Sequence, residues 1–136
     1  MTLLDILKEQ KAGKFPGGIY HKTQIDLTYN YNHMEGSRLT HEQTRCIFET
    51  NTIGIENEIL NVDDVIETTN HFRCIDMIID NARSALSEKF IKELHLTLKN
   101  GTSDSKKSGS LLVATKNFQT RLAAWIPFFR KKLPLR

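Results

Sequence analysis

The sequence predicts an all-α fold, and two observations support this prediction. Apolar residues recur with helical spacing in five segments between residues 3 and 99, and most of these segments begin or end at residues that commonly cap helices. In addition, no stretch before Gly101 alternates apolar and polar residues as a half-buried strand does. A chain of 136 residues with 39% hydrophobic content is long enough for one domain with a core.

Two of the expected helices precede Gly36. An apolar pattern near the N-terminus predicts a short helix that ends around residues 11–13, before the turn sequence FPGG at residues 15–18. A second helix is expected from about Lys22 to Met34, because this stretch lacks Gly and Pro, and Gly36 is its expected stop. One face of this helix would carry Ile25, Tyr29 and Asn32, and another would carry Leu27, Tyr31 and Met34.

Three further helices are expected after Gly36. Their start signals are the capping-box pattern of Thr40 and Gln43, then Asn61 or Asp63, and finally Ser87. These helices are expected to end near Thr50, Ala82 and the pair Asn100-Gly101. The residues expected to face the core are Ile47, Phe48, Val62, Val65, Ile66, Phe72, Ile75, Ile79, Phe90, Ile91, Leu94 and Leu98.

Charge is distributed unevenly along the chain. Residues 1–105 contain 11 Lys and Arg and 16 Asp and Glu, a net charge of −5, whereas residues 106–136 contain 8 Lys and Arg and no acidic residue. A basic segment of this kind can attract nucleic acid or an acidic membrane surface, and the alternative is a solvated tail without a partner. We therefore divide the chain into a body, residues 1–105, and a basic tail, residues 106–136.

The composition favours a cytoplasmic protein. No apolar run reaches the ~18–20 residues that a membrane span needs, and the N-terminal sequence MTLLDILKEQK lacks the basic start and apolar centre of a signal peptide. Cys46 and Cys74 lie within helical patterns and lack a metal-ligand spacing. We interpret both as small buried residues in a reducing compartment.

The residues by themselves show no catalytic constellation. No pair among the five histidines, which are His21, His33, His41, His71 and His95, has the spacing of a helical zinc site. The phosphate-binding patterns GxxxxGK[ST] and GxGxxG do not occur either. We therefore expect no metal or cofactor site in this chain, and we assign His71, Phe72 and His95 to packing.

A resemblance to a known family adds a functional prediction. The run IDLTYNYNHMEGSRLTHEQTRCIFET, residues 25–50, resembles the N-terminal part of Fic-domain proteins, which typically reads TYNSNxIEGSxLTxxET. Further along, residues 70–76 resemble the helix that follows in that family, and residues 86–102 resemble its pattern LTExxIkeLHxxLxxGT. The resemblance covers about residues 20–105, and its motifs occur in the order of the family.

The resemblance implies a regulatory role for Glu35 and Gly36. Fic proteins mostly transfer AMP from ATP, with Mg²⁺, to a hydroxyl group of a target protein. In many members a glutamate in an (S/T)xxxE(G/N) motif inhibits this reaction by pairing with an arginine that would otherwise hold the γ-phosphate of ATP. By resemblance, Glu35-Gly36 is that pair and the helix at about residues 22–35 is the inhibitory helix. One departure is Tyr31, which stands where the family has Ser or Thr, so inhibition is expected to be weaker.

Glu35 also has a simpler interpretation, as a solvated carboxylate at a helix end. The neighbouring family matches favour the inhibitory role over that alternative. The active-site motif HxFx(D/E)GNGRxxR, which supplies the arginine, does not occur in the chain. We therefore expect the chain to be truncated before this motif and to lack adenylyltransferase activity.

The basic tail is interpreted as the product of a shifted reading frame. In the family, the stretch after GTSDS often reads WFAVGxYKKLPNEVGG. Residues 114–125, ATKNFQTRLAAW, can be encoded so that the adjacent frame reads YKKLPNEVGGM, and the same shift permits WFAVG over residues 108–113. A segment without one acidic residue after Asp104 fits a sequence that was never selected as protein.

Two other functions remain open at this stage. An antitoxin-like binding module could donate its inhibitory helix to a separate Fic enzyme in trans. A binder of nucleic acid or membrane through the basic tail would show salt-sensitive binding that is lost when residues 106–136 are deleted. We expect no specific nucleic acid and no membrane as partners, and a target protein or a Fic enzyme as the partner class.

The frameshift hypothesis predicts the nucleotide sequence of the gene. The adjacent frame over residues 108–125 should encode the family stretch, and HxFx(D/E)GNGR should follow downstream in a frame other than that of this chain. Sequencing the gene and its downstream region measures both. A tail-coding region whose adjacent frames bear no relation to the family stretch would contradict the hypothesis.

Overall fold

The computed structural model describes residues 2–55 and 59–103, and within these ranges the chain forms five α-helices and no strand. The predicted all-α fold is therefore confirmed for the described residues. The basic tail, to which the frameshift hypothesis applies, lies outside the described residues. Among the described residues, no helix is both long enough and apolar enough to cross a membrane.

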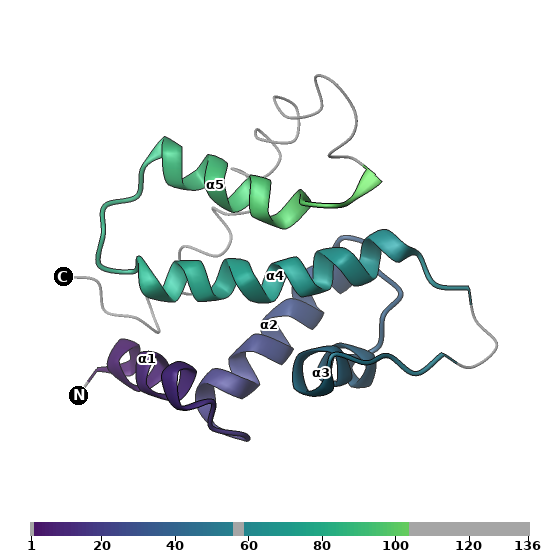
Figure 1. Ribbon diagram of the computed structural model, residues 1–136, viewed down its shortest axis with the longest axis horizontal. Coiled ribbons are helices and arrows are strands. Elements are labelled where there is room, and N and C mark those ends of the chain that lie inside the picture. The colour runs from purple at the N-terminus through teal and green to yellow at the C-terminus, as the bar shows by residue number, and fades with distance from the viewer. Residues whose placement is uncertain (1, 56–58, 104–136) are drawn as a thin grey trace.

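Helix α4 (Val62–Asp80), with 19 residues the longest element, is the axis of the arrangement. Helix α5 (Glu88–Lys99) packs along one side of α4, and α1 (Leu3–Gly13) and α3 (His41–Thr50) lie on the opposite side (Figure 1). Helix α2 (Ile19–Met34) crosses α4 and also packs against α1 and α3. This central crossing places the C-terminal end of α2 beside the N-terminal half of α4.

Four of the five helices begin at a polar side chain that caps the first turn. Thr40 accepts a hydrogen bond from the Gln43 amide while the Gln43 side chain accepts one from the Thr40 amide, which confirms the predicted capping box of α3. Asn61 and Ser87 cap α4 and α5 as predicted. Thr2 caps α1 in the same way. Local sequence therefore sets these four helix starts.

Helix α2 is the exception, and its predicted start was wrong. It begins at Ile19, three residues before the expected Lys22, and its N-cap, Gly18, has no side chain to accept a hydrogen bond. The capping group comes instead from α1, where Gln10 Oε1 accepts a bond of 2.9 Å from the Tyr20 amide. A Cβ atom at Gly18 would lie 2.4 Å from this oxygen, so a larger residue here would displace the end of the Gln10 side chain and with it the cap.

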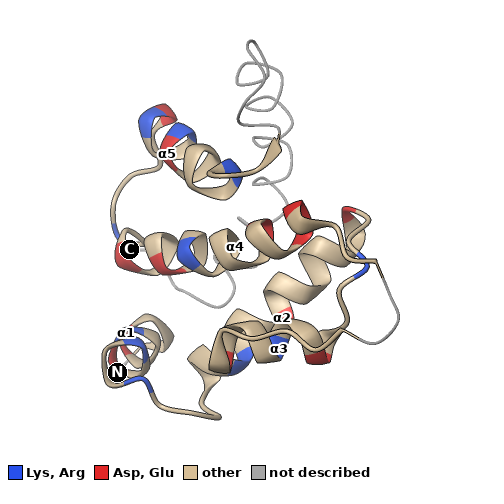
Figure 2. Cartoon of the chain, turned by 45° about the vertical axis from the view of Figure 1, so that its right-hand side comes forward, with Lys and Arg blue, Asp and Glu red and all other residues tan. Residues whose placement is uncertain are grey.

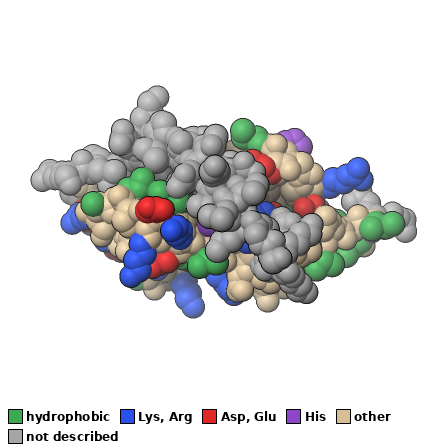
Figure 3. All heavy atoms as spheres, turned by 90° about the horizontal axis from the view of Figure 1, so that it is seen from above, with side chains coloured by type: hydrophobic (Ala, Val, Ile, Leu, Met, Phe, Trp, Pro, Cys, Tyr) green, Lys and Arg blue, Asp and Glu red, His purple; other side chains and the backbone are tan. Residues whose placement is uncertain are grey.

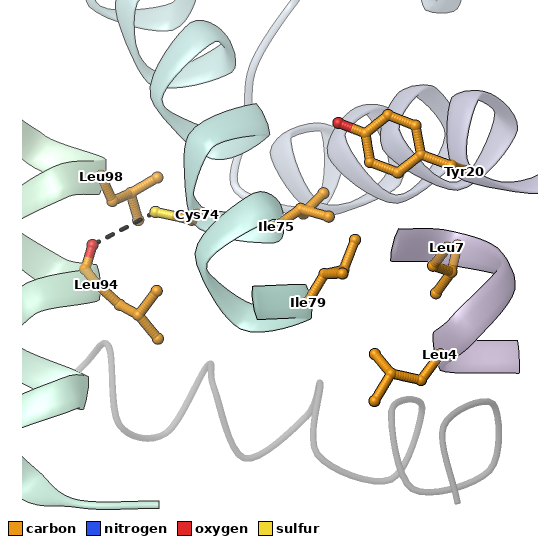
Figure 4. Close-up of a cluster of buried hydrophobic side chains, with 8 residues drawn as sticks. All are labelled: Leu4, Leu7, Tyr20, Cys74, Ile75, Ile79, Leu94 and Leu98. Carbon is orange, nitrogen blue, oxygen red and sulfur yellow. Dashed lines mark hydrogen bonds between the residues drawn. The ribbon is translucent and has the colours of Figure 1, made fainter. Parts of the chain in front are cut away.

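Two apolar clusters form the core. The larger joins α1, α2, α4 and α5, and Figure 4 shows its eight buried side chains: Leu4, Leu7, Tyr20, Cys74, Ile75, Ile79, Leu94 and Leu98. The smaller consists of Leu39, Ile47 and Phe72, with Phe48 packed against both clusters. Burial raises the pKa of the Cys74 thiol to about 12, and its Sγ donates to the Leu94 carbonyl at 3.4 Å. Cys74 is thus the small buried residue that the sequence predicts.

Some inward-facing predictions were wrong. Val62, the first residue of α4, is 68% exposed. Cys46 is only half-buried. Exposed apolar side chains are scattered over the described surface, and Figure 3 shows them at several separate places on one face. His71, Phe72 and His95 are buried, as expected.

The position of Leu94 at the centre of the larger cluster predicts a large effect of shortening it. Leu94 is fully buried at 0% exposure, whereas Leu96 on the same helix is 56% exposed. Leu94→Ala should lower the free energy of unfolding by about 2–5 kcal/mol, because it removes buried methyl groups and leaves a cavity. The matched control Leu96→Ala should lower it by about 0.5 kcal/mol or less. Urea unfolding followed by circular dichroism measures both, and equal losses would contradict this assignment of the core.

Candidate functional site

Glu35 and Gly36 form the C-terminal cap of α2. Glu35 is the C-cap residue, and Gly36 follows it with a φ of +94°, a left-handed conformation that favours glycine. The Ser37 amide donates to the Asn32 carbonyl at 2.9 Å and the Gly36 amide donates to the His33 carbonyl at 3.1 Å. This pair of bonds is the Schellman motif. The Glu-Gly pair therefore has a conformational explanation, in which glycine ends the helix and turns the chain.

The carboxylate of Glu35 occupies a position that the helix itself disfavours. The C-terminal end of a helix carries partial negative charge from carbonyl groups without an intrahelical partner, so cations rather than anions are stabilised there. By contrast, α4 follows the favourable rule, with Asp63 and Asp64 in its first turn (Figure 2). Glu35 is exposed, and its neighbour Met34 is 82% exposed. The end of α2 thus carries two exposed residues, one acidic and one apolar.

A row of polar side chains on α2 faces α4. Tyr20, Gln24, Thr28 and Asn32 follow one another at intervals of four residues, so they lie along one face of the helix, and all four are buried. We call these four residues the polar row. Of the three residues predicted to share one face of α2, Ile25 and Asn32 are buried and Tyr29 is half-buried. Polar side chains occupy most of this contact because α4 offers hydrogen-bonding groups at matching positions.

The first two residues of the polar row form hydrogen bonds with Asp76 of α4. The Tyr20 hydroxyl donates to Asp76 Oδ1 at 2.5 Å, and Gln24 Nε2 lies 2.9 Å from the same oxygen and 3.1 Å from the Phe72 carbonyl. Burial raises the pKa of Asp76 above its ordinary value, although the bonds from Tyr20 and Gln24 oppose this shift. Burial and the hydrogen bond to Asp76 also raise the pKa of Tyr20. The Tyr20 hydroxyl therefore remains a proton donor at neutral pH.

The last two residues of the polar row form hydrogen bonds with His71 and Thr68 of α4. Thr28 Oγ1 lies 2.8 Å from Nδ1 of the fully buried His71, and Asn32 Nδ2 donates to Thr68 Oγ1 at 3.1 Å. The ring of Tyr31 lies against His71, with ring centroids 5.0 Å apart. Tyr31 is therefore placed one turn before Glu35 and packs on a buried residue of α4.

The other side of α2 is attached to α3 by two histidine–carboxylate pairs. His21 Nε2 lies 2.8 Å from Glu49 Oε2, and His41 Nε2 lies 2.8 Å from Asp26 Oδ1. The ring of Tyr29 stacks on His33 and meets the edge of His41. Within the described ranges, no three side chains of His, Cys, Asp or Glu gather in a way that could hold a metal ion.

The predicted site residues are thus brought to one end of α2, and the groups that hold this end were not predicted. Sequence reasoning missed Gln24, Thr28 and Thr68 because it searched for apolar periodicity. The four-residue spacing of the polar row was the available signal. Comparison of the chain with models of known protein families gave no match, and a comparison with curated proteins gave none either.

The raised pKa of Asp76 predicts how stability depends on pH. A carboxyl group that binds its proton more tightly in the folded state contributes stability that is complete below the ordinary pKa of 3.8 and is lost as pH rises through the folded pKa. In Asp76→Asn the side chain stays neutral and keeps Oδ1 as an acceptor for Tyr20 and Gln24. The free energy of unfolding of the variant minus that of the parent should therefore increase with pH.

Urea unfolding of both proteins at several pH values from about 3 to about 7 measures this difference. Taking the difference removes the opposite contributions of Asp5 and Glu42, whose pKa values are lowered by hydrogen bonds from Thr2 and Arg45 respectively. A difference that stays constant or decreases as pH rises would contradict the assignment.

Proposed function

We propose that this chain is the inhibitory part of a Fic-type protein adenylyltransferase, and that Glu35 is the group that restrains AMP transfer. The observation that carries the proposal is the placement of Glu35. An acidic residue is exposed directly after the last turn of a helix, at the end that disfavours negative charge, and buried hydrogen bonds fix this helix to α4. A carboxylate held in this way is suited to meet a cation on a partner surface.

The chemistry of the proposed contact is the pairing of a carboxylate with a guanidinium group. An arginine side chain presents a planar set of N–H donors that matches the two oxygens of a carboxylate as well as those of a phosphate. Glu35 would therefore compete with the γ-phosphate of ATP for the same arginine. While that arginine is paired with Glu35, ATP and its Mg²⁺ would not reach the arrangement needed for transfer of AMP to the target hydroxyl.

The arginine in this proposal belongs to the Fic motif HxFx(D/E)GNGR, which does not occur in the 136 residues. It would come either from a separate Fic enzyme or from the product of the adjacent reading frame. The chain by itself is expected to transfer no AMP. Donation in trans is the form of the proposal that can be tested with this chain as it exists.

Glu35→Gln tests the role of the carboxylate. The purified chain is added to a Fic adenylyltransferase that lacks its own inhibitory helix, together with labelled ATP, Mg²⁺ and a protein substrate. The parent chain should reduce labelling, and Glu35→Gln should require about ten- to hundredfold more protein for the same reduction, because a charge-assisted bond is replaced by a neutral one.

The matched control is Glu9→Gln, which makes the same change at an exposed position of α1 and should inhibit as the parent does. Incubation of the chain alone with labelled ATP and Mg²⁺ should give no self-labelling. Equal inhibition by the parent and Glu35→Gln, or no inhibition by the parent, would overturn donation in trans.

A further inference from the structure

Asn32 has two structural roles at the end of α2. Its backbone carbonyl accepts hydrogen bonds from the Ser37 amide at 2.9 Å and from the Glu35 amide at 3.1 Å, so the turn that carries Glu35 folds back onto this residue. Its side chain, in contrast to its backbone carbonyl, lies in the contact with α4, and the residue is only 7% exposed. One residue thus joins the turn at Glu35 to the neighbouring helix.

The side-chain contact of Asn32 has a defined direction of hydrogen bonding. Thr68 is fully buried, and its hydroxyl donates its single proton to the Asp64 carbonyl at 2.7 Å. The hydroxyl oxygen can therefore only accept from Asn32, whose Nδ2 donates to it at 3.1 Å. An amide at position 32 satisfies this requirement, and a side chain without a donor does not.

We propose that Asn32 is a positioning residue for Glu35. This inference rests on the proposed function and names a regulatory contact of the same site. The bond from Asn32 to Thr68 fixes the rotation of the last turn of α2 relative to α4, and the Schellman motif passes this orientation to Glu35. When the bond is lost, α2 stays helical, because its other three polar residues still contact α4, but Glu35 samples other directions. Inhibition then weakens although the carboxylate is intact.

Amide hydrogen exchange tests the positioning step without reference to any enzyme. In Asn32→Ala, the amides of Glu35 and Ser37 should exchange about tenfold faster relative to the slowest amides of α4, because the last turn of α2 loses a hydrogen bond and the Thr68 hydroxyl loses its donor. Asn30→Ala changes the same residue type at an exposed position of the same helix and should leave this ratio within about twofold. An unchanged ratio in Asn32→Ala would overturn the proposal.

Substitutions of Thr68 separate the hydrogen bond from packing. Thr68→Val keeps the shape but removes the acceptor, and should raise the exchange ratio as Asn32→Ala does. Thr68→Ser keeps the hydroxyl and should preserve the ratio of the parent. The double variant Asn32→Ala/Thr68→Val should exchange no faster than either single variant, because both remove one shared interaction. Additive effects, or a loss in Thr68→Ser equal to that in Thr68→Val, would overturn the proposal.

The inhibition assay then connects the position of Glu35 with function. Asn32→Ala should weaken inhibition about tenfold, in proportion to its effect on the exchange ratio, while Asn30→Ala should not. Ile79→Val, which removes one buried methyl group from the larger core cluster and so lowers overall stability, should leave inhibition unchanged. Faster exchange in Asn32→Ala with full inhibition would overturn the positioning role while the proposed function stands. Failure of Glu35→Gln to weaken inhibition would instead remove the proposed function, and the exchange data would still show whether Asn32 fixes the turn.

Discussion

The contact between the polar row of α2 and α4 is the constraint on which the remaining structure depends. Helices usually pack by fitting ridges of apolar side chains into grooves, so their relative rotation is set by shape. Here the hydrogen bonds to Asp76, His71 and Thr68 require one rotation and one register of α2. The two apolar clusters supply the hydrophobic stabilisation that a polar interface lacks, and the larger one includes Tyr20 of the polar row itself.

The polar row also lowers the stability of the fold relative to an apolar contact. Gln24 is fully buried, and its Oε1 has no hydrogen-bond partner among the described residues, which costs about 1–3 kcal/mol. Burying Asp76 has a further cost, which appears as its raised pKa. A leucine or isoleucine at these positions would avoid both costs but would define the orientation of α2 less strictly. An interface that keeps these polar groups is consistent with a helix whose defined orientation relative to α4 is important for the protein.

Much of the fold could be predicted from sequence because its signals are local. Thr40, Asn61 and Ser87 mark helix starts through bonds within three residues of the cap, and Gly36 marks a helix end through its own conformation. The start of α2 could not be predicted, because its capping group is Gln10 from another helix. The buried polar face could not be predicted from apolar periodicity. Glu35 was a candidate only because of the proposed resemblance to Fic proteins, whereas the packing of Tyr31 on His71 depends on how α2 crosses α4.

Both ends of α2 are fastened to other parts of the chain, and this limits how the proposed inhibition could be relieved. At its start, the Gln10 side chain holds the first turn. At its end, the left-handed Gly36 reverses the chain so that Leu39, only 4% exposed, enters the smaller cluster. Helix α2 therefore cannot swing away as a hinged gate without breaking the core on both sides. Because α2 is held at both ends, relief of the proposed inhibition would come from movement or dissociation of the partner. Its rate would then be the rate of dissociation and not the rate of local unfolding of α2.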